Sequence, residues 1–283
     1  MPNIRIIRQQ NEPGERGPSR GMYALQKALR ERDIPWLKVG GPLKSGDIPW
    51  IWLYKDANLA IHFNDYFGWP FILGPNVLFW DSYNPGKKEY ERKLLDANSC
   101  ALMFTESLWY AALIQQNCNH NEAPIKIWPY PIDPQPDGPL APEFDLLIYL
   151  KDMTMGREAI RAQERWPKSN LVTYGRYDRN DLIELARRSR ACLYLCNDDR
   201  GPLAAAEIAL AGCPLVGVER GCPWTTEYML GIKLPHFSNQ VMVRGVEAAF
   251  ELRRPFVRES AQKFFDIDGI VDTVVEALEP LVD

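Results

Sequence analysis

The sequence has few histidines, no long apolar runs and no excess of positive charge. Its mean hydropathy is -0.30, and no apolar run approaches the roughly 18 residues that a membrane-spanning helix needs. Only three His are present, and the six Cys include no Cys-x2-Cys pair, so the usual zinc-site spacings are excluded. The net charge of −4 argues against strong nonspecific binding of nucleic acid, which depends on clustered Lys and Arg.

The cysteines and the first residues bear on the cellular compartment. Cys192 and Cys196 lie in an apolar run, so we interpret them as small core residues. The opening residues, MPNIRIIRQQ, contain no apolar segment typical of a secretory signal. We therefore expect a soluble protein with reduced thiols in the cytoplasm, or in the host-cell cytoplasm if the protein is viral.

Apolar runs alternate with helical patterns along the chain, which is typical of parallel sheets joined by helices. The strands that we expect are residues 4–8, 36–41, 48–54, 70–77, 99–107, 125–133, 145–151, 170–175, 191–196 and 214–219, with residues 57–63 as a second short strand or the approach to one. The expected helices are residues 22–34, 89–98, 108–117, 157–166, 178–189 and 204–212, with two or three more over 241–281.

A proline-rich stretch divides the chain. Residues 134–144 hold four Pro in eleven positions and form the best candidate for a linker. We therefore predict an α/β fold with two Rossmann-like domains, residues 1–135 and 136–283, that face each other across a cleft, with helices at the C-terminus.

The most informative segment runs from Asp198 to Gly221. A buried strand leads into a polar turn, and the turn opens a helix of small residues. Ligands of open α/β sheets bind at the carboxyl ends of strands, and the N–H groups of a helix start suit a phosphate. Asp199 and Glu207 stand on about the same side of this helix, two turns apart.

The acidic pair and the residues after it carry a resemblance. Asp199-x7-Glu207, followed by Ala211-Gly212-Cys213-Pro214-Leu215-Val216, resembles the donor-site signature of retaining, nucleotide-sugar-dependent glycosyltransferases of the GT-B fold. The family usually has Glu where this chain has Asp199. The resemblance is good over about residues 145–225. It implies a nucleoside-diphosphate sugar as donor, with UDP the expected nucleotide, and no metal or other cofactor.

The resemblance implies roles for residues of the C-terminal half. Glu207 would accept hydrogen bonds from the ribose hydroxyls, and Asp199 would face the transferred sugar, although Asp is also a favoured helix cap and Asp198 competes for the role. Lys151 would stabilise the departing diphosphate. Further donor-binding candidates are Gly201, Leu203, Ala204, Arg157, Arg176, Tyr177 and, in the first loop of the N-terminal half, Gly17.

The N-terminal half would then bind the acceptor. His62 is a candidate for orienting the acceptor hydroxyl, although a lone His in an apolar segment is often structural. The other acceptor candidates are Asn64, Asp65, Asn76, Asp81 and Arg20. The many Trp of this half suit either sugar stacking or a core, and their spacing does not separate the two.

Three alternatives keep the same fold. In the first, the acceptor is a hydroxymethylated base in DNA, as in phage glucosyltransferases, instead of a glycan. The chain could instead be a nonenzymatic nucleotide-binding protein, which Asp199 in place of Glu favours. A sugar-phosphate epimerase of the same architecture is the third.

Overall fold

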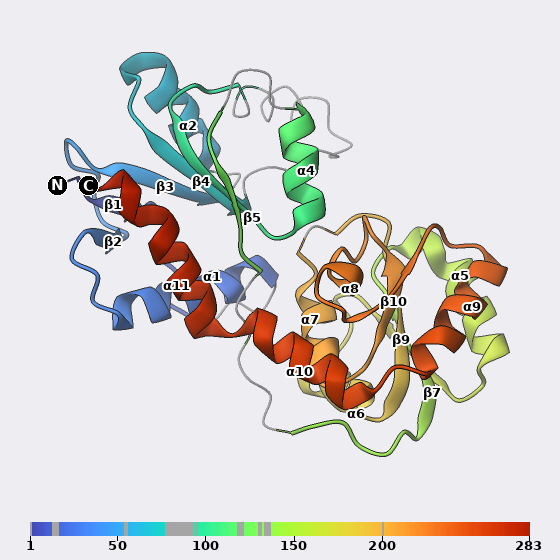
Figure 1. Cartoon of the computed structure of the whole chain (residues 1–283). Coiled ribbons are helices and arrows are strands. Elements are labelled where there is room, and N and C mark those ends of the chain that lie inside the picture. Colours follow the sequence, from blue (N-terminus) through green and yellow to red (C-terminus); the bar gives the residue numbers. More distant parts are fainter. Residues whose placement is uncertain are drawn as a thin grey trace. The chain divides into compact units, whose positions relative to one another are not determined.

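The computed structural model describes residues 2–12, 17–53, 56–76, 93, 96–117, 122–129, 132, 137–199 and 201–283. The chain divides into two compact units: unit 1 is Met1–Pro131 with Ile267–Asp283, and unit 2 is Ile132–Asp266. Each unit has a parallel sheet with helices (Figure 1), which confirms the predicted α/β fold with two Rossmann-like domains.

Unit 1 contains the first sheet. Its strands are β1 (Ile4–Ile6), β2 (Leu37–Val39), β3 (Ile48–Leu53), β4 (Phe71–Asn76), β5 (Cys100–Thr105) and β6 (Ile125–Ile127). They lie in the order β2-β1-β3-β4-β5-β6, and the registered pairs are parallel. The helices are α1 (Gly17–Glu31), α2 (Ala57–His62), the π-helix η2 (Phe63–Phe67), α4 (Leu108–Asn117), α11 (Ile267–Leu278) and the 3₁₀ turn η4 (Glu279–Leu281).

The tryptophans of unit 1 form much of its core. Trp50, Trp52 and Trp128 are almost fully buried with Phe104, and neighbouring ring centroids lie 5.0–5.7 Å apart. Trp50 donates a hydrogen bond from Nε1 to the carbonyl of Gly74 at 3.0 Å. These three rings therefore belong to the core and are not available to stack on a sugar.

Unit 2 contains the second sheet. Its strands are β7 (Phe144–Leu150), β8 (Ser169–Thr173), β9 (Ser189–Leu195), β10 (Leu215–Val218) and β11 (Gly231–Leu234), in the order β11-β10-β9-β7-β8. The helices are η3 (Met153–Met155), α5 (Gly156–Arg165), α6 (Arg179–Arg187), α7 (Leu203–Leu210), α8 (Trp224–Glu227), α9 (Asn239–Phe250) and α10 (Arg254–Phe265).

Side chains of the second sheet alternate between its two faces. Leu147 and Tyr149 of β7 pack with α6, α7 and α10, whereas Leu146 and Ile148 pack with α5 and α9. Because both faces are covered, the strands read as continuous apolar runs, which is why the sequence predicts them well.

The last helix differs from the predicted domain division. Residues 136–283 were expected to form one domain, but α11 packs on α1 in unit 1 (Figure 1). Ile270, Val271, Val274 and Leu278 are buried with Leu25 and Leu29 of α1, because the apolar stripe of α11 matches that of α1. Arg32 also pairs with Asp272 of α11 at 2.9 Å.

Two short elements correct the sequence reading. Residues 57–63 were predicted as a strand, but Ala57–His62 is the helix α2, since a short apolar run fits either period. The strand β11 was not predicted, because Gly231–Leu234 has only four residues, too few to show a period. The predicted helix at 89–98 lies mostly outside the described residues.

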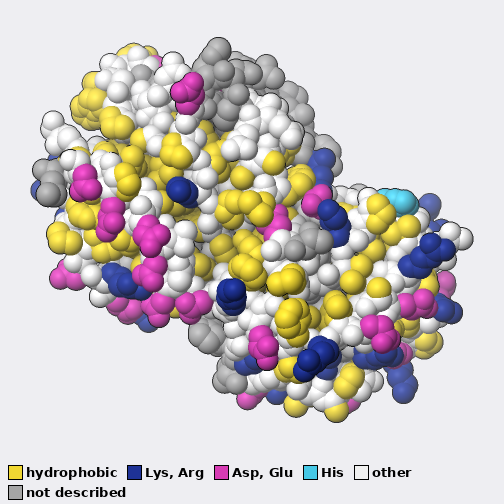
Figure 2. Space-filling model, in the orientation of Figure 1, with side chains coloured by type: hydrophobic (Ala, Val, Ile, Leu, Met, Phe, Trp, Pro, Cys, Tyr) yellow, Lys and Arg dark blue, Asp and Glu magenta, His cyan; other side chains and the backbone are white. Residues whose placement is uncertain are grey.

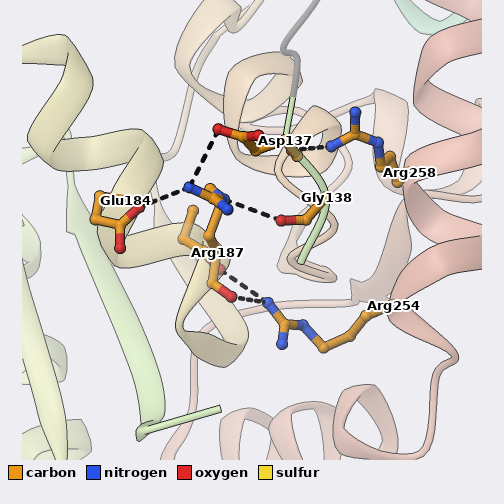
Figure 3. Close-up of polar contacts among 7 residues, drawn as sticks. Asp137, Gly138, Glu184, Arg187, Arg254 and Arg258 are labelled. Carbon is orange, nitrogen blue, oxygen red and sulfur yellow. Dashed lines mark hydrogen bonds and ion pairs between the residues drawn. The ribbon is translucent and has the colours of Figure 1, made fainter. Parts of the chain in front are cut away.

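An arginine cluster fixes the start of unit 2 (Figure 3). Arg254 donates to the carbonyl of Arg187, as Figure 3 shows. It also donates to the carbonyls of Gly212 at 3.0 Å, Leu140 at 2.6 Å and Ala186 at 3.2 Å. Arg187 itself donates to the carbonyl of Gly138 at 2.9 Å. The chain that enters β7 is thus tied to the carboxyl end of α6 and to α10.

Candidate functional site

An ion pair lies where the second sheet reverses its strand order. Because β7 is flanked by β8 and β9, the chain leaves β7 and β9 in different directions, and this is where open α/β sheets bind ligands. Lys151 follows β7 and Asp199 lies in the loop after β9. Nζ of Lys151 bonds Oδ2 of Asp199, so two residues that the sequence singled out separately are joined here.

Four tyrosines lie around this pair. The hydroxyl of Tyr194 donates to Oδ2 of Asp199 at 3.1 Å. Tyr149 pairs with Tyr194 across β7 and β9, and their rings stack with centroids 4.9 Å apart. The hydroxyls of Tyr149 and Tyr177 are 3.0 Å apart, and Nζ of Lys151 lies 5.4 Å from the ring centre of Tyr174. Aromatic side chains therefore surround the ion pair, and one of them is Tyr177, a predicted donor-binding residue.

The helix α7 presents the second acidic residue. Its neighbours Ala206 and Ile208 are fully buried, yet Glu207 keeps 10% of its side chain exposed. Nε of Arg179, from the first turn of α6, bonds Oε1 of Glu207. A carboxylate in such a place needs a partner, and Arg179 is a site residue that the sequence reading missed.

Two glycines of unit 2 allow loops to approach closely, one at the opposite edge of the sheet and one at the site. Gly212 follows α7 and lies where the chain enters β7 and β10; it has φ +79°, and a Cβ there would lie 2.9 Å from Cγ of Pro139. A Cβ on Gly221 would lie 1.8 Å from the carbonyl oxygen of Cys196, so only glycine fits. The N–H of Asp199 donates to the carbonyl of Arg220 at 3.0 Å, which joins the loops after β9 and β10.

Burial and neighbouring charges set the protonation states at the site. Burial alone would lower the pKa of Lys151, but Asp199 outweighs it and raises that pKa, so the ammonium stays charged. Burial raises the pKa of Tyr194 well above its ordinary value and that of Cys196 to about 12. The Tyr194 hydroxyl therefore remains a donor, and Cys196 is an unreactive thiol, as its interpretation as a core residue requires.

The remaining predicted donor residues lie at strand and helix ends. Gly201 precedes α7, and Leu203 and Ala204 form its first turn, next to Asp199. Arg176 is exposed in the turn after β8, and Arg157 is exposed in the first turn of α5. In unit 1, Gly17 is the first residue of α1, and the preceding loop residues 13–16 lie outside the described residues.

The predicted acceptor residues of unit 1 that the structure describes are spread over four elements. Asn76 ends β4 and Arg20 lies near the start of α1, both at the carboxyl edge of the first sheet. His62 was expected at a strand end but ends α2, where its ring lies 4.8 Å from that of Tyr66. His62 is exposed at the far end of α2, which starts at that edge, and Asn64 and the exposed Asp65 lie in the π-helix η2 that follows. Asp81 lies outside the described residues.

Sequence reasoning missed an ion pair in unit 1. Arg8 follows β1 and bonds Asp56, which precedes α2, through Nε at 2.9 Å and Nη2 at 2.6 Å. Since β1 lies between β2 and β3, this pair is at the strand-order reversal of the first sheet. Gln26 of α1 is fully buried; it donates to the Arg8 carbonyl at 2.7 Å and accepts from the Gln10 N–H at 2.8 Å.

The described ranges of the chain offer neither a metal centre nor a membrane-spanning helix. Within those ranges, no group of three or more His, Cys, Asp and Glu is arranged to hold a metal ion. No helix there is long and apolar enough to cross a membrane. Independence of metal remains a prediction.

Solved structures identify the fold. The chain is similar to sucrose-phosphate synthase (tll1590) from Thermosynechococcus elongatus, with a TM-score of 0.72 and 11% identity over 100% of this chain and 99% of that one. It is similar to Alr3699/HepE of Anabaena in complex with UDP and glucose, with a TM-score of 0.62 and 12% identity over 99% and 100%. The chain has the GT-B fold.

A third solved structure is similar in fold, whereas the sequence itself has no match. The lipopolysaccharide outer core galactosyltransferase WaaB matches with a TM-score of 0.59 and 9% identity, over 93% of this chain and 80% of that one. No family model and no curated protein matches the sequence. At these identities the likeness establishes the fold, and activity has to be argued from the site.

Proposed function

We propose that the chain is a glycosyltransferase that moves a sugar from a UDP-sugar to a hydroxyl group, with retention of configuration at the anomeric carbon. The observation that carries this proposal is the Lys151–Asp199 pair at the strand-order reversal of the second sheet. The structure of the similar HepE contains UDP and glucose, which favours a UDP-sugar as the donor class.

In this proposal the donor binds to unit 2. The ribose hydroxyls donate to Glu207, whose carboxylate is already held by Arg179. The diphosphate lies against Lys151 and against the start of α7, where the first N–H groups have no partner within the helix. Asp199 accepts a hydrogen bond from a hydroxyl of the transferred sugar.

The reaction needs charge stabilisation more than a nucleophile. The bond between the anomeric carbon and the phosphate oxygen breaks, and its electron pair stays on the phosphate. The acceptor oxygen bonds to the anomeric carbon from the same face, and its proton passes to the departing phosphate. Lys151 is charged and turns from Asp199 to that phosphate when the donor binds, so it lowers the barrier as the negative charge develops.

The acceptor binds to unit 1 in this proposal, and a neutral saccharide is favoured. Lys and Arg side chains are interspersed with Asp and Glu over the face in Figure 2, without the basic stripe typical of a DNA-binding surface. The Lys151 position favours turnover over a nonenzymatic binding role, because binding alone does not need a cation at the scissile bond.

Calorimetry with UDP, UDP-glucose, GDP-mannose and ADP-glucose tests the proposal. We expect the uridine nucleotides to bind, and Glu207→Ala to weaken UDP binding by about 1.5–3 kcal/mol, or roughly 10- to 150-fold. Glu219→Ala removes the exposed partner of Lys233 and serves as the control, with unchanged affinity. UDP affinity that is equal in wild type and in a folded Glu207→Ala variant would refute the donor site.

Turnover gives two further tests. Release of UDP from UDP-glucose should continue in EDTA, because Lys151 and the start of α7 bind the diphosphate in this proposal. NMR of the product should show the anomeric configuration of the donor. A requirement for divalent metal, or an inverted product, would contradict the proposed mechanism.

A further inference from the structure

The sugar-facing carboxylate has two partners on one oxygen. Lys151 and Tyr194 both bond Oδ2 of Asp199, and Oδ1 accepts no hydrogen bond from the residues that the structure describes. The proposed function needs Lys151 to turn toward the diphosphate when the donor binds. Asp199, only 10% exposed, would then lose its charged partner unless another donor remained.

Tyr194 is built to be that donor. Its side chain is 1% exposed, and its ring is held between the core and Tyr149, with an angle of 15° between the stacked rings. A ring fixed in this way cannot follow Lys151 to the phosphate, so its hydroxyl stays with Asp199. Its pKa is raised by burial, which keeps the hydroxyl protonated and able to donate.

We propose that Tyr194 is a positioning residue, which keeps the Asp199 carboxylate oriented toward the transferred sugar while Lys151 engages the diphosphate. This inference rests on the proposed function and adds a residue to it. Oδ2 stays bonded to Tyr194, and Oδ1 remains the oxygen that accepts the sugar hydroxyl. Tyr149 supports the ring of Tyr194 from the neighbouring strand and has no bond to Asp199.

The activity test compares Tyr194→Phe with a matched core variant. Tyr194→Phe should lower kcat for UDP release from UDP-glucose about tenfold, while the Kd for UDP stays within about twofold. The control, Tyr228→Phe, removes a hydroxyl from the same core at a ring that stacks on Phe264, and should leave both values unchanged. In an Asp199→Ala background, Tyr194→Phe should change kcat less than about twofold, because the two residues act as one unit.

A stability test needs no activity. In a Lys151→Ala background Tyr194 is the side-chain partner of Asp199 that remains among the described residues, so Tyr194→Phe should lower the melting temperature by several degrees more than it does in wild type. An equal shift in both backgrounds, or an equal loss of kcat with and without Asp199, would overturn the role of Tyr194. Failure of the wild type to bind any uridine nucleotide would instead refute the proposed function, and the melting comparison would still judge the Tyr194 contact.

Discussion

Each unit has an ion pair at the place where its sheet reverses strand order, and the two pairs differ in chemistry more than in burial. Side-chain exposure is 36% and 11% for Arg8 and Asp56, against 26% and 10% for Lys151 and Asp199. Arg8 holds Asp56 through two N–H groups, whereas Lys151 reaches Asp199 through one ammonium. The forked bond fixes orientation, and the single ammonium sits on a flexible stem.

This difference suggests which pair can open. A lysine can leave its carboxylate for a phosphate, provided that another group keeps the carboxylate in place, as Tyr194 does. A forked arginine pair stays closed and offers neutral hydroxyl groups both donors and acceptors. This difference supports the proposal that the second sheet binds an anionic donor and the first an uncharged acceptor.

The largest expected effect is on stability, at a buried ion pair of unit 1. It distinguishes an ion pair that holds the fold together from the two pairs at the strand-order reversals. Arg5 bonds Asp47 at 2.6 Å, with side chains only 10% and 2% exposed. Asp47→Asn leaves the Arg5 charge uncompensated and should lower the free energy of unfolding by about 3–5 kcal/mol in urea titrations. Asp268→Asn, at an exposed pair with Arg32, should cost less than about 1 kcal/mol. Similar costs for both variants would contradict this assignment.

Removing Lys151, the cation that can leave its carboxylate, tests the proposed role of unit 2 in stabilising the diphosphate. Lys151→Ala should lower kcat for sugar transfer by about 10²- to 10³-fold, as loss of one stabilising group at a developing charge typically does. Kinetics at saturating donor measure it. Lys233→Ala, which removes an exposed partner of Glu219, should keep full activity. A Lys151→Ala variant with normal kcat would show that the diphosphate is stabilised elsewhere.

The regular part of the chain could be predicted from the sequence. The strands of unit 2 are buried on both faces, so their apolar runs stand out, and Gly212 with Pro214 marks the end of α7. Lys151 and Asp199 were predicted as site residues because each follows a recognisable strand, and Glu207 because it lies in a helix of small apolar residues; their roles remain predictions. Short segments such as α2 and β11 were missed or misassigned, because a few residues carry too little periodicity.

The contacts of the site could not be predicted in the same way. Arg179 meets Glu207 only because α6 and α7 lie side by side, and Tyr194 meets Asp199 through a turn whose shape the spacing does not specify. The Arg8–Asp56 pair had a signal that went unused: both residues lie beyond the carboxyl ends of strands. Placing β3 next to β1, as the reversal of strand order demands, would have brought them together.

Replacing the two-pronged guanidinium of Arg8 tests the proposed role of unit 1 in binding the acceptor. Arg8→Lys keeps the charge but loses one of the two bonds to Asp56, so the loop after β1 should bind the acceptor less well. We expect the KM for the acceptor to rise about three- to tenfold while the Kd for UDP stays the same. Steady-state kinetics and calorimetry separate the two. A change in UDP affinity alone would mean that this pair serves the donor.

The smallest expected effect is a dependence of stability on acid. Burial alone would raise the pKa of Asp47, but bonds from Arg5, the Lys44 N–H and Asn3 outweigh it, so that pKa lies below its ordinary 3.8. A carboxyl with a lowered folded pKa stabilises the fold above its unfolded pKa, and this contribution is lost as the pH falls through the folded value.

The acid effect can be isolated by comparing wild type with Asp47→Asn in urea titrations at decreasing pH. The stability gap between them should be constant near neutral pH and narrow below about pH 4, because protonated Asp47 resembles Asn. Asp152 of unit 2 also titrates in acid: burial alone would raise its pKa, but hydrogen bonds from Thr154 and Asn197 lower it. Because Asp152 is present in both proteins, its contribution cancels in the comparison. A gap that widens in acid would mean that the pKa of Asp47 is raised by its burial, and that Arg5 does not stabilise the carboxylate.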